Sequence, residues 1–202
     1  MIDSGAVVKG ALRGVRASLK SEGFKARNSL FYRTDDDNVL LVSVQKSVHS
    51  SAEESQLTVN YGVRSLRLAR RLREDPSADL DIRRAHWRKR LSEGGKEKWL
   101  HVLARDTVEH ATMIIASAVL QILPDLVAHS SNEALRDEWL SGASPGIGRI
   151  QCLLYASILL DEIGPREKTR AVVTELRQLV AGTIHERQIE RELADAGIGE
   201  RP

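Results

Sequence analysis

Residues 23–63 read GFKARNSLFYRTDDDNVLLVSVQKSVHSSAEESQLTVNYGV, and this stretch decides the fold. It predicts three antiparallel strands, near residues 30–34, 39–47 and 56–63. The second strand is a run of β-branched and aliphatic residues, and the third alternates apolar with polar or small side chains, the period of a strand with one buried face. The apolar set comprises Leu40, Val42, Val44, Leu57, Val59, Tyr61 and Val63. Paired strands place their apolar sets on one side, so a second, polar face is expected opposite.

Helices are predicted on both sides of this stretch. Val8, Leu12, Val15 and Leu19 form a helical stripe before it. After it, residues 108–122 carry a second stripe, which we expect to pack on the apolar face of the sheet. Asp106 is the expected cap of that helix, and Pro124 is expected to kink or end it because proline lacks the N–H donor.

Two further strands are predicted near residues 84–91 and 99–102, with a turn at Gly94-Gly95. Residues 66–72 fit either a strand extension or a short helix. The fold class is therefore α+β: an antiparallel sheet of about four or five strands packed against helices. We expect a single domain over residues 1–202, with an α+β module at 1–129 and a helical C-terminal extension at 130–202.

The composition indicates a soluble, cytoplasmic protein. The 202 residues are 42% hydrophobic with a formal net charge of +2, and the single cysteine, Cys152, suits a reducing compartment. Charged residues interrupt the N-terminal segment, so no signal peptide is expected. The longest apolar stretch, residues 108–127, contains Glu109, His110 and Pro124, which favours a core helix and not a membrane span.

The C-terminal extension contains one helix that is apolar on nearly every side. It begins at Ile150 and ends at Ile163. Such a helix is either central to a helical layer or part of a homodimer interface. In both cases Cys152 is expected to be a buried core residue.

No motif for cofactor, metal or nucleophilic chemistry is present. The sequence lacks G-x-G-x-x-G, a P-loop and G-x-S-x-G, and its Glu-His pairs do not extend to H-E-x-x-H. We therefore expect no cofactor and no metal, and no catalytic residue is assigned. A catalytic triad stays open, because its members need not be adjacent in sequence.

The remaining candidate site is the polar face of the sheet. Strand alternation places Ser43 and Thr58 there, together with the proposed ligand-binding residues Gln45, Asn60, His86, Arg88 and Arg90. Guanidinium groups beside amides and a histidine can hold a carboxylate or phosphate through charge-assisted bonds. The alternative is that these side chains simply face water, which is common for one side of an antiparallel sheet.

The order of several short motifs resembles that of an uncharacterised, mainly bacterial family, domain of unknown function 4304. The similar pieces lie between about residues 6 and 125: Gly23-Phe24-Lys25, Phe31-Tyr32-Arg33, Val44-Gln45-Lys46-Ser47, Leu57-Thr58-Val59-Asn60-Tyr61-Gly62-Val63, His86-Trp87-Arg88-Lys89-Arg90-Leu91 and Lys98-Trp99. Leu100 stands where the family often shows a second tryptophan. The resemblance implies an α+β module and no established activity.

Three function classes follow from these observations. The first is a non-catalytic interaction protein, immunity-like or regulatory, whose partner is another protein. The second is a nucleic-acid-binding protein that uses the basic segment beginning at Arg64 and ending at Arg90, which has about ten basic against four acidic residues. The third is an enzyme that acts on a small anionic substrate at the polar sheet face.

Overall fold

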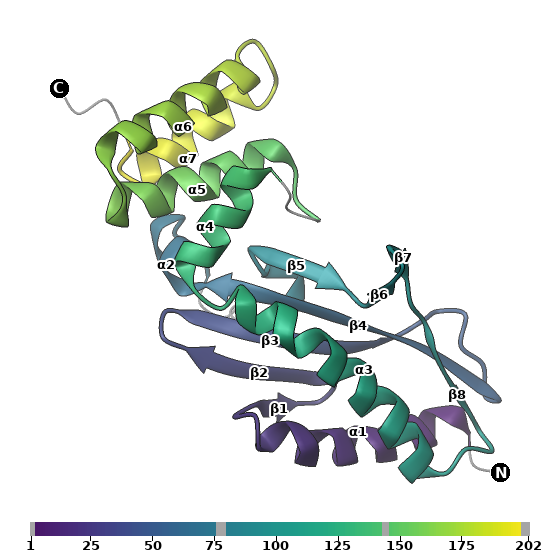
Figure 1. The fold of residues 1–202 in the computed structure, drawn as a ribbon. Coiled ribbons are helices and arrows are strands. Elements are labelled where there is room, and N and C mark those ends of the chain that lie inside the picture. The colour runs from purple at the N-terminus through teal and green to yellow at the C-terminus, as the bar shows by residue number, and fades with distance from the viewer. Residues whose placement is uncertain (1–2, 76–79, 143–145, 199–202) are drawn as a thin grey trace.

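The computed structural model describes residues 3–75, 80–142 and 146–198, and Figure 1 shows their arrangement. Six strands form one antiparallel sheet: β1 (Lys25–Arg27), β2 (Leu30–Asp35), β3 (Asn38–Lys46), β4 (Glu54–Ser65), β5 (Trp87–Arg90) and β8 (Leu100–Leu103). The order is β1-β2-β3-β4-β5, and β8 also pairs with β4. The predicted α+β class and antiparallel sheet are confirmed, with six strands because the short β1 joins the edge.

β4 is the longest strand, and two short strands share one of its edges. β5 pairs with its later half, at Asn60 to Val63, and β8 pairs with its earlier half, at Glu54 to Leu57. β3 occupies the opposite edge. A separate two-stranded hairpin, β6 (Ser92–Glu93) and β7 (Lys96–Glu97), joins β5 to β8. Its turn is the predicted Gly94-Gly95, and both glycines have positive φ.

The predicted apolar face is buried by two helices, α1 (Ser4–Lys20) and α3 (Val108–Ala128). Val42 lies opposite Tyr61 and Val44 opposite Val59, so the apolar sets of β3 and β4 share one side. One continuous core joins them to α3 through Ala111, Ile115, Val119 and Ile122. Within the described residues α3 is the one helix long and apolar enough to cross a membrane. Its buried residues pack on the sheet as part of the core.

The opposite face of the sheet is polar only in part. Near the start of β3 it carries a second apolar cluster, which the chain between residues 80 and 85 covers: Val39, Leu41 and Ala85 with Leu30, Tyr32, Leu66, Leu80 and Ile82. Residues 66–72 fit either a strand or a helix in the sequence, and in the structure they form the helix α2 (Leu66–Arg71). A short 3-10 helix, η2 (Ile82–Arg84), lies further along the chain, before β5. Ser65 caps α2 by accepting the N–H of Leu68.

One expectation for α3 is wrong, and one of the two outcomes expected at Pro124 does not occur. Its cap is Thr107, whose side chain accepts the N–H of His110, while Asp106 instead accepts the N–H of Leu103. The helix also continues past Pro124 to Ala128. Leu120 and Pro124 are both exposed, so water can take the place of the hydrogen bond that proline cannot donate.

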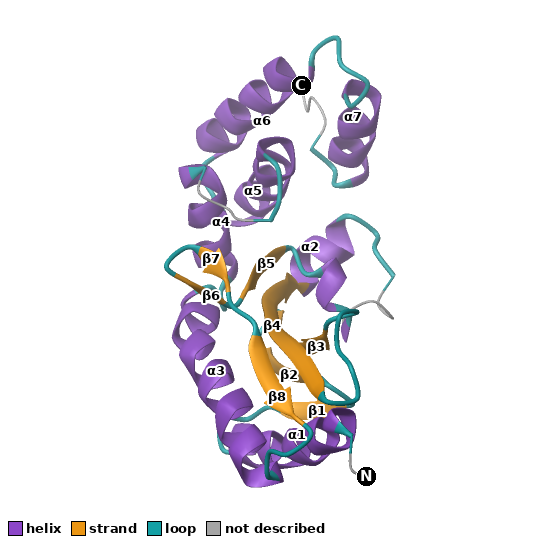
Figure 2. Cartoon of the chain, turned by 90° about the vertical axis from the view of Figure 1, so that its right-hand side faces the viewer, coloured by secondary structure: helices purple, strands orange, loops and turns teal. Residues whose placement is uncertain are grey.

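The C-terminal helices form a layer at one end of the sheet (Figures 1 and 2). They are α4 (Asn132–Ser141), α5 (Arg149–Ile163), α6 (Arg166–Val180) and α7 (Glu186–Asp195). The apolar helix α5 lies inside this layer, with Cys152, Leu153, Leu154, Ile158, Leu159 and Leu160 buried within the chain. The same core cluster includes the sheet and these helices. The structure therefore shows this helix in a central position within a helical layer, the first of the two positions that the sequence allowed.

Candidate functional site

The pairing of three strands builds the polar side of the candidate site. Ser43 lies opposite Asn60, and Asn60 lies opposite Arg90 on the other side of β4. Gln45 follows two residues after Ser43 and shares its face, because alternate residues of a strand point the same way. Arg88 lies opposite Gly62, two residues before Arg90. Four of the predicted site residues therefore come from three neighbouring strands.

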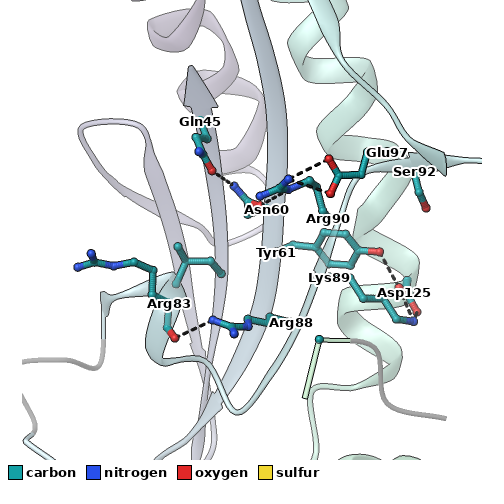
Figure 3. Close-up of a pocket in the computed structure, with 12 residues that line it drawn as sticks. Gln45, Asn60, Tyr61, Arg83, Arg88, Lys89, Arg90, Ser92, Glu97 and Asp125 are labelled. Carbon is teal, nitrogen blue, oxygen red and sulfur yellow. Dashed lines mark hydrogen bonds and ion pairs between the residues drawn. The ribbon is translucent and has the colours of Figure 1, made fainter. Parts of the chain in front are cut away.

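A chain of side-chain hydrogen bonds fixes the centre of this face (Figure 3). The Asn60 amide donates to Oε1 of Gln45 at 2.8 Å, and Nε of Arg90 donates to Oδ1 of Asn60 at 3.0 Å. Nη1 of Arg90 also donates to both carboxylate oxygens of Glu97, each at 2.9 Å. Arg90 is thus held between β4 and the β6–β7 hairpin, so its position is set before any ligand arrives.

Arg88 has a different environment from Arg90. Its Nη1 donates to the backbone carbonyl oxygen of Arg83 at 3.0 Å, and Arg83 itself pairs with Asp81. In the part of the chain that the structure describes, Arg88 forms no ion pair with a carboxylate. Its side chain is exposed, and its guanidinium charge is therefore available to an incoming anion.

These residues line an open cavity of about 750 Å³. The edge of the sheet also brings side chains from the helix-covered face into its wall. Nζ of Lys89 lies 3.2 Å from Oδ2 of Asp125 on α3, and the Tyr61 hydroxyl donates to the same oxygen at 2.8 Å. Four cations, Arg83, Arg88, Lys89 and Arg90, and two carboxylates, Glu97 and Asp125, line the cavity. Its wall is therefore net positive.

His86 does not lie on this face, so the expectation that it joins the site is wrong. It precedes β5, whose pairing with β4 begins at Trp87, and strand alternation does not extend to it. Its ring is buried, and its Nδ1 accepts the backbone N–H of Ser65 at 3.0 Å. The ring packs edge-on against Tyr155 of α5, with 5.0 Å between ring centres. Thr58 is also buried, and its hydroxyl donates to the carbonyl oxygen of Lys98.

His86 belongs instead to a buried polar cluster near the junction with the C-terminal helices. Nη1 of the fully buried Arg64 lies 2.7 Å from Oε2 of Glu74, and Nε2 of His86 lies 3.4 Å from the same oxygen. Burial acts to raise the pKa of the Glu74 carboxyl, but His86 and Arg64 outweigh it and hold that pKa below its ordinary value. The cluster is therefore an internal ion-paired network, and removal of one of its members would leave a buried charge uncompensated.

Residues 15–124 match the family described as Domain of unknown function (DUF4304). This match covers more than half of the chain. The chain belongs to this family. No curated protein and no solved structure matches it.

The matched DUF4304 region begins in the last third of α1, spans all strands of the sheet and ends inside α3. All the residues proposed for ligand binding fall within it, whereas the helices α4 to α7 lie outside. The cavity wall is consequently built almost entirely by the family region, apart from Asp125 and Gly146.

The chemistry available in the cavity is that of ion pairing and hydrogen bonding. Each carboxylate in its wall already contacts a cation, Glu97 with Arg90 and Asp125 with Lys89. The structure, over residues 3–75, 80–142 and 146–198, contains no group of three or more His, Cys, Asp or Glu side chains arranged to hold a metal ion. The wall supplies guanidinium and amide donors that suit a carboxylate or phosphate.

Sequence reasoning missed several residues of the cavity, namely Tyr61, Arg83, Lys89, Glu97 and Asp125. Alternation places Lys89 and Tyr61 on the helix-covered face, and only the position of β5 at the edge of the sheet brings them into the same cavity. The position of Glu97 in the cavity wall could have been predicted from the sequence. The Gly94-Gly95 turn predicts a hairpin that folds back toward the end of β5, where a carboxylate can meet Arg90.

Proposed function

We propose that this protein is a non-catalytic binding module that engages an acidic segment of another protein at the polar sheet face. The observation that carries the proposal is the state of Arg88, an exposed guanidinium in the cavity wall with no carboxylate partner in the described residues. Arg90, beside it, is held rigidly by Asn60 and Glu97. A pre-positioned guanidinium binds a carboxylate at low entropic cost, since fewer rotamers are lost.

Binding fits this cavity better than catalysis does. The carboxylates in its wall are engaged by Arg90 and Lys89, and no histidine or cysteine is among its described lining residues. An interaction protein of the immunity or regulatory kind needs no more than a rigid recognition surface. The single cysteine supports a cytoplasmic setting for it.

The ion pairs of the basic segment count against nucleic-acid binding as its main role. Most arginines there pair with acids of this same chain: Arg64 with Glu74, Arg67 and Arg70 with Asp37, Arg71 with Asp161 and Glu162, Arg73 with Asp195, and Arg83 with Asp81. Nucleic-acid affinity depends on cations that are free to neutralise phosphates. Few cations in this basic segment are free in that sense.

The proposal is tested with a fluorescently labelled peptide of alternating glutamate and serine, measured by anisotropy at low salt. We expect saturable binding that Arg88→Ala with Arg90→Ala weakens by about tenfold or more, because charge-assisted contacts are lost. The matched control is Arg187→Ala with Arg191→Ala, two exposed arginines on α7. Circular dichroism checks that both double variants are folded.

Two competitors separate the remaining function classes. Inorganic phosphate that displaces the peptide at sub-millimolar concentration would favour a small anionic ligand. A DNA duplex that binds more tightly than the peptide would favour the nucleic-acid class. Equal peptide affinity of the parent and the Arg88/Arg90 variant contradicts the proposal outright.

A further inference from the structure

The outer face of α3 carries a row of exposed apolar side chains. Met113, Leu120 and Val127 are 64%, 50% and 44% exposed. In the described part of the chain, four of the seven exposed large hydrophobic residues belong to this one helix. The three are spaced by seven residues, which is two helical turns, so they lie along one line. Ala116 and Pro124 fall between them on the same side.

α1 runs beside α3 in the same direction. A Cβ at Gly10 would lie 2.9 Å from Cγ2 of Val108, and one at Gly14 would lie 2.6 Å from Cγ2 of Thr112. Residue numbers therefore rise together along the contact, and the two glycines allow the helices to approach closely. Figures 1 and 2 both show α1 and α3 adjacent on the same side of the sheet.

The exposed side of α1 is a row of cations. Lys9, Arg13, Arg16 and Lys20 recur at helical spacing and are all exposed. The helix contains no aspartate or glutamate, and none of the four forms an ion pair with a carboxylate among the described residues. The acids nearest to the two helices in sequence are Asp3, which caps the start of α1, Glu22, beyond its end, and Glu109, in the first turn of α3.

We propose that this α1–α3 surface, defined by the apolar row Met113, Leu120 and Val127 and the basic row of α1, docks an amphipathic helix of a partner protein. The partner helix would place apolar side chains on the α3 row and acidic side chains toward α1. A seven-residue repeat is the spacing by which two helices pack along a seam. The row spans about 21 Å, which a helix of about four turns matches.

The shape of the apolar row favours a single helix over a membrane. The row is one side chain wide, and Ser117 and Gln121 are exposed on the same helix. Membrane-binding helices present a broad apolar face, commonly with Trp or Phe, and no aromatic residue occurs in α3. A second copy docked face to face would bring the cations of α1 together. The polarity of the surface instead calls for an acidic partner.

This surface is separate from the polar sheet face. α3 and α1 cover one face of the sheet, whereas Arg88 and Arg90 lie with Asn60 on the other. The inference consequently stands or falls independently of the proposed binding of an acidic segment in the cavity.

The test is a displayed library of helical peptides of about 18 residues. Their apolar seam is fixed as leucine and alanine, and their flanks vary among Glu, Lys, Gln and Ser. Selection on the full chain is expected to enrich glutamate on the flank facing α1. A selected peptide should then bind at least about tenfold more weakly to Leu120→Glu and to Arg13→Glu with Arg16→Glu, since central contacts dominate interfaces.

Matched controls are the substitution Leu179→Glu on α6, where the leucine is 45% exposed, and Arg187→Glu with Arg191→Glu on α7. Both should leave the peptide affinity within about twofold of the parent, because substitutions outside an interface change affinity little. Met113→Glu, at the most exposed position of the row, replaces Leu120→Glu if that variant does not fold. The Arg88→Ala with Arg90→Ala variant should also bind the selected peptide normally.

Three outcomes overturn the inference. One is a selection that enriches no helix, or enriches lysine on the flank. Another is a peptide whose affinity is the same for the parent and the Leu120→Glu and Met113→Glu variants. The third is tight binding to vesicles of phosphatidylserine and phosphatidylcholine that the same substitutions abolish, since this assigns the surface to a membrane.

Discussion

The hydroxyl of Tyr61 on β4 donates a hydrogen bond to the Asp125 carboxylate on α3, at 2.8 Å. Lys89 of β5 pairs with the same carboxylate at 3.2 Å. One acidic side chain thus joins the core helix to two neighbouring strands at the rim of the cavity. Burial first, and Asp125 second, raise the pKa of Tyr61 well above its ordinary value of 10.0.

The raised pKa of Tyr61 makes the fold sensitive to alkali. A folded-state pKa above the unfolded value stabilises the protein fully below pH 10, and this contribution is lost as pH rises further. Asp125→Asn should lower the Tyr61 pKa because it removes the nearby negative charge. Phenolate absorbance followed against pH is expected to rise earlier in the variant than in the parent. Superimposable titrations would refute the assignment.

Val42 lies at the centre of the face covered by α3 and is fully buried. Val42→Asp should unfold the protein, because a buried, unpaired carboxylate costs several kcal/mol. The matched control is Val48→Asp, since Val48 is 93% exposed. It should melt within about a degree or two of the parent, as surface substitutions change stability little. A parental melting curve for Val42→Asp would show that the register is wrong.

Gly62 allows β5 to pair closely with β4. A Cβ there would lie 2.4 Å from the carbonyl oxygen of Trp87, and both strands would have to separate. Gly62→Ala is expected to destabilise the fold by about 2–3 kcal/mol in denaturant unfolding. Gly148, the N-cap of α5, has open space around it, so Gly148→Ala serves as control and should cost under about 1 kcal/mol. Equal midpoints for the two variants would contradict this close approach.

Glu74 should contribute to stability at neutral pH and lose that contribution in acid. Its pKa lies below the ordinary value of 4.5, so the stabilisation is present above pH 4.5 and disappears as pH falls through the folded-state value. Glu74→Gln should cost up to about 3 kcal/mol at pH 7, because the fully buried Arg64 loses its ion pair with Glu74. Urea unfolding between pH 3 and 7 measures both effects. The exposed Glu22→Gln is the control, and identical pH profiles for the two variants would count against the network.

Cys152 should react slowly with a thiol reagent in the native protein. It is 2% exposed in α5, inside the layer formed by the C-terminal helices. Reaction then requires opening of that layer, whereas denaturant should make labelling fast and stoichiometric. Equal rates of Cys152 labelling in the native and the denatured protein would show that this helix lies at the surface.

The sheet could be predicted from the sequence because the pattern of apolar residues within each short strand is enough to indicate which side chains are buried. Alternation in residues 39–47 and 56–63 determines which side chains are buried, and antiparallel pairing then brings Gln45, Asn60, Arg88 and Arg90 to one face. His86 was misplaced because the strand ladder begins one residue after it, and no local pattern reveals that boundary. Asp125 could not be assigned, since its contact with Tyr61 depends on how α3 crosses the sheet.

The sharing of one β4 edge by β5 and β8 has a consequence for how this fold can diversify. The β6–β7 hairpin leaves the sheet after one short strand and returns before the next, so it forms no part of the ladder it interrupts. Its length and sequence can change without moving either strand, as is typical of exposed excursions. Because Glu97 and Ser92 of this hairpin line the cavity, exchanging the hairpin would change the charge and shape of the cavity wall while the scaffold is conserved. The hairpin is therefore the natural segment to randomise when new binding specificities are sought on this fold.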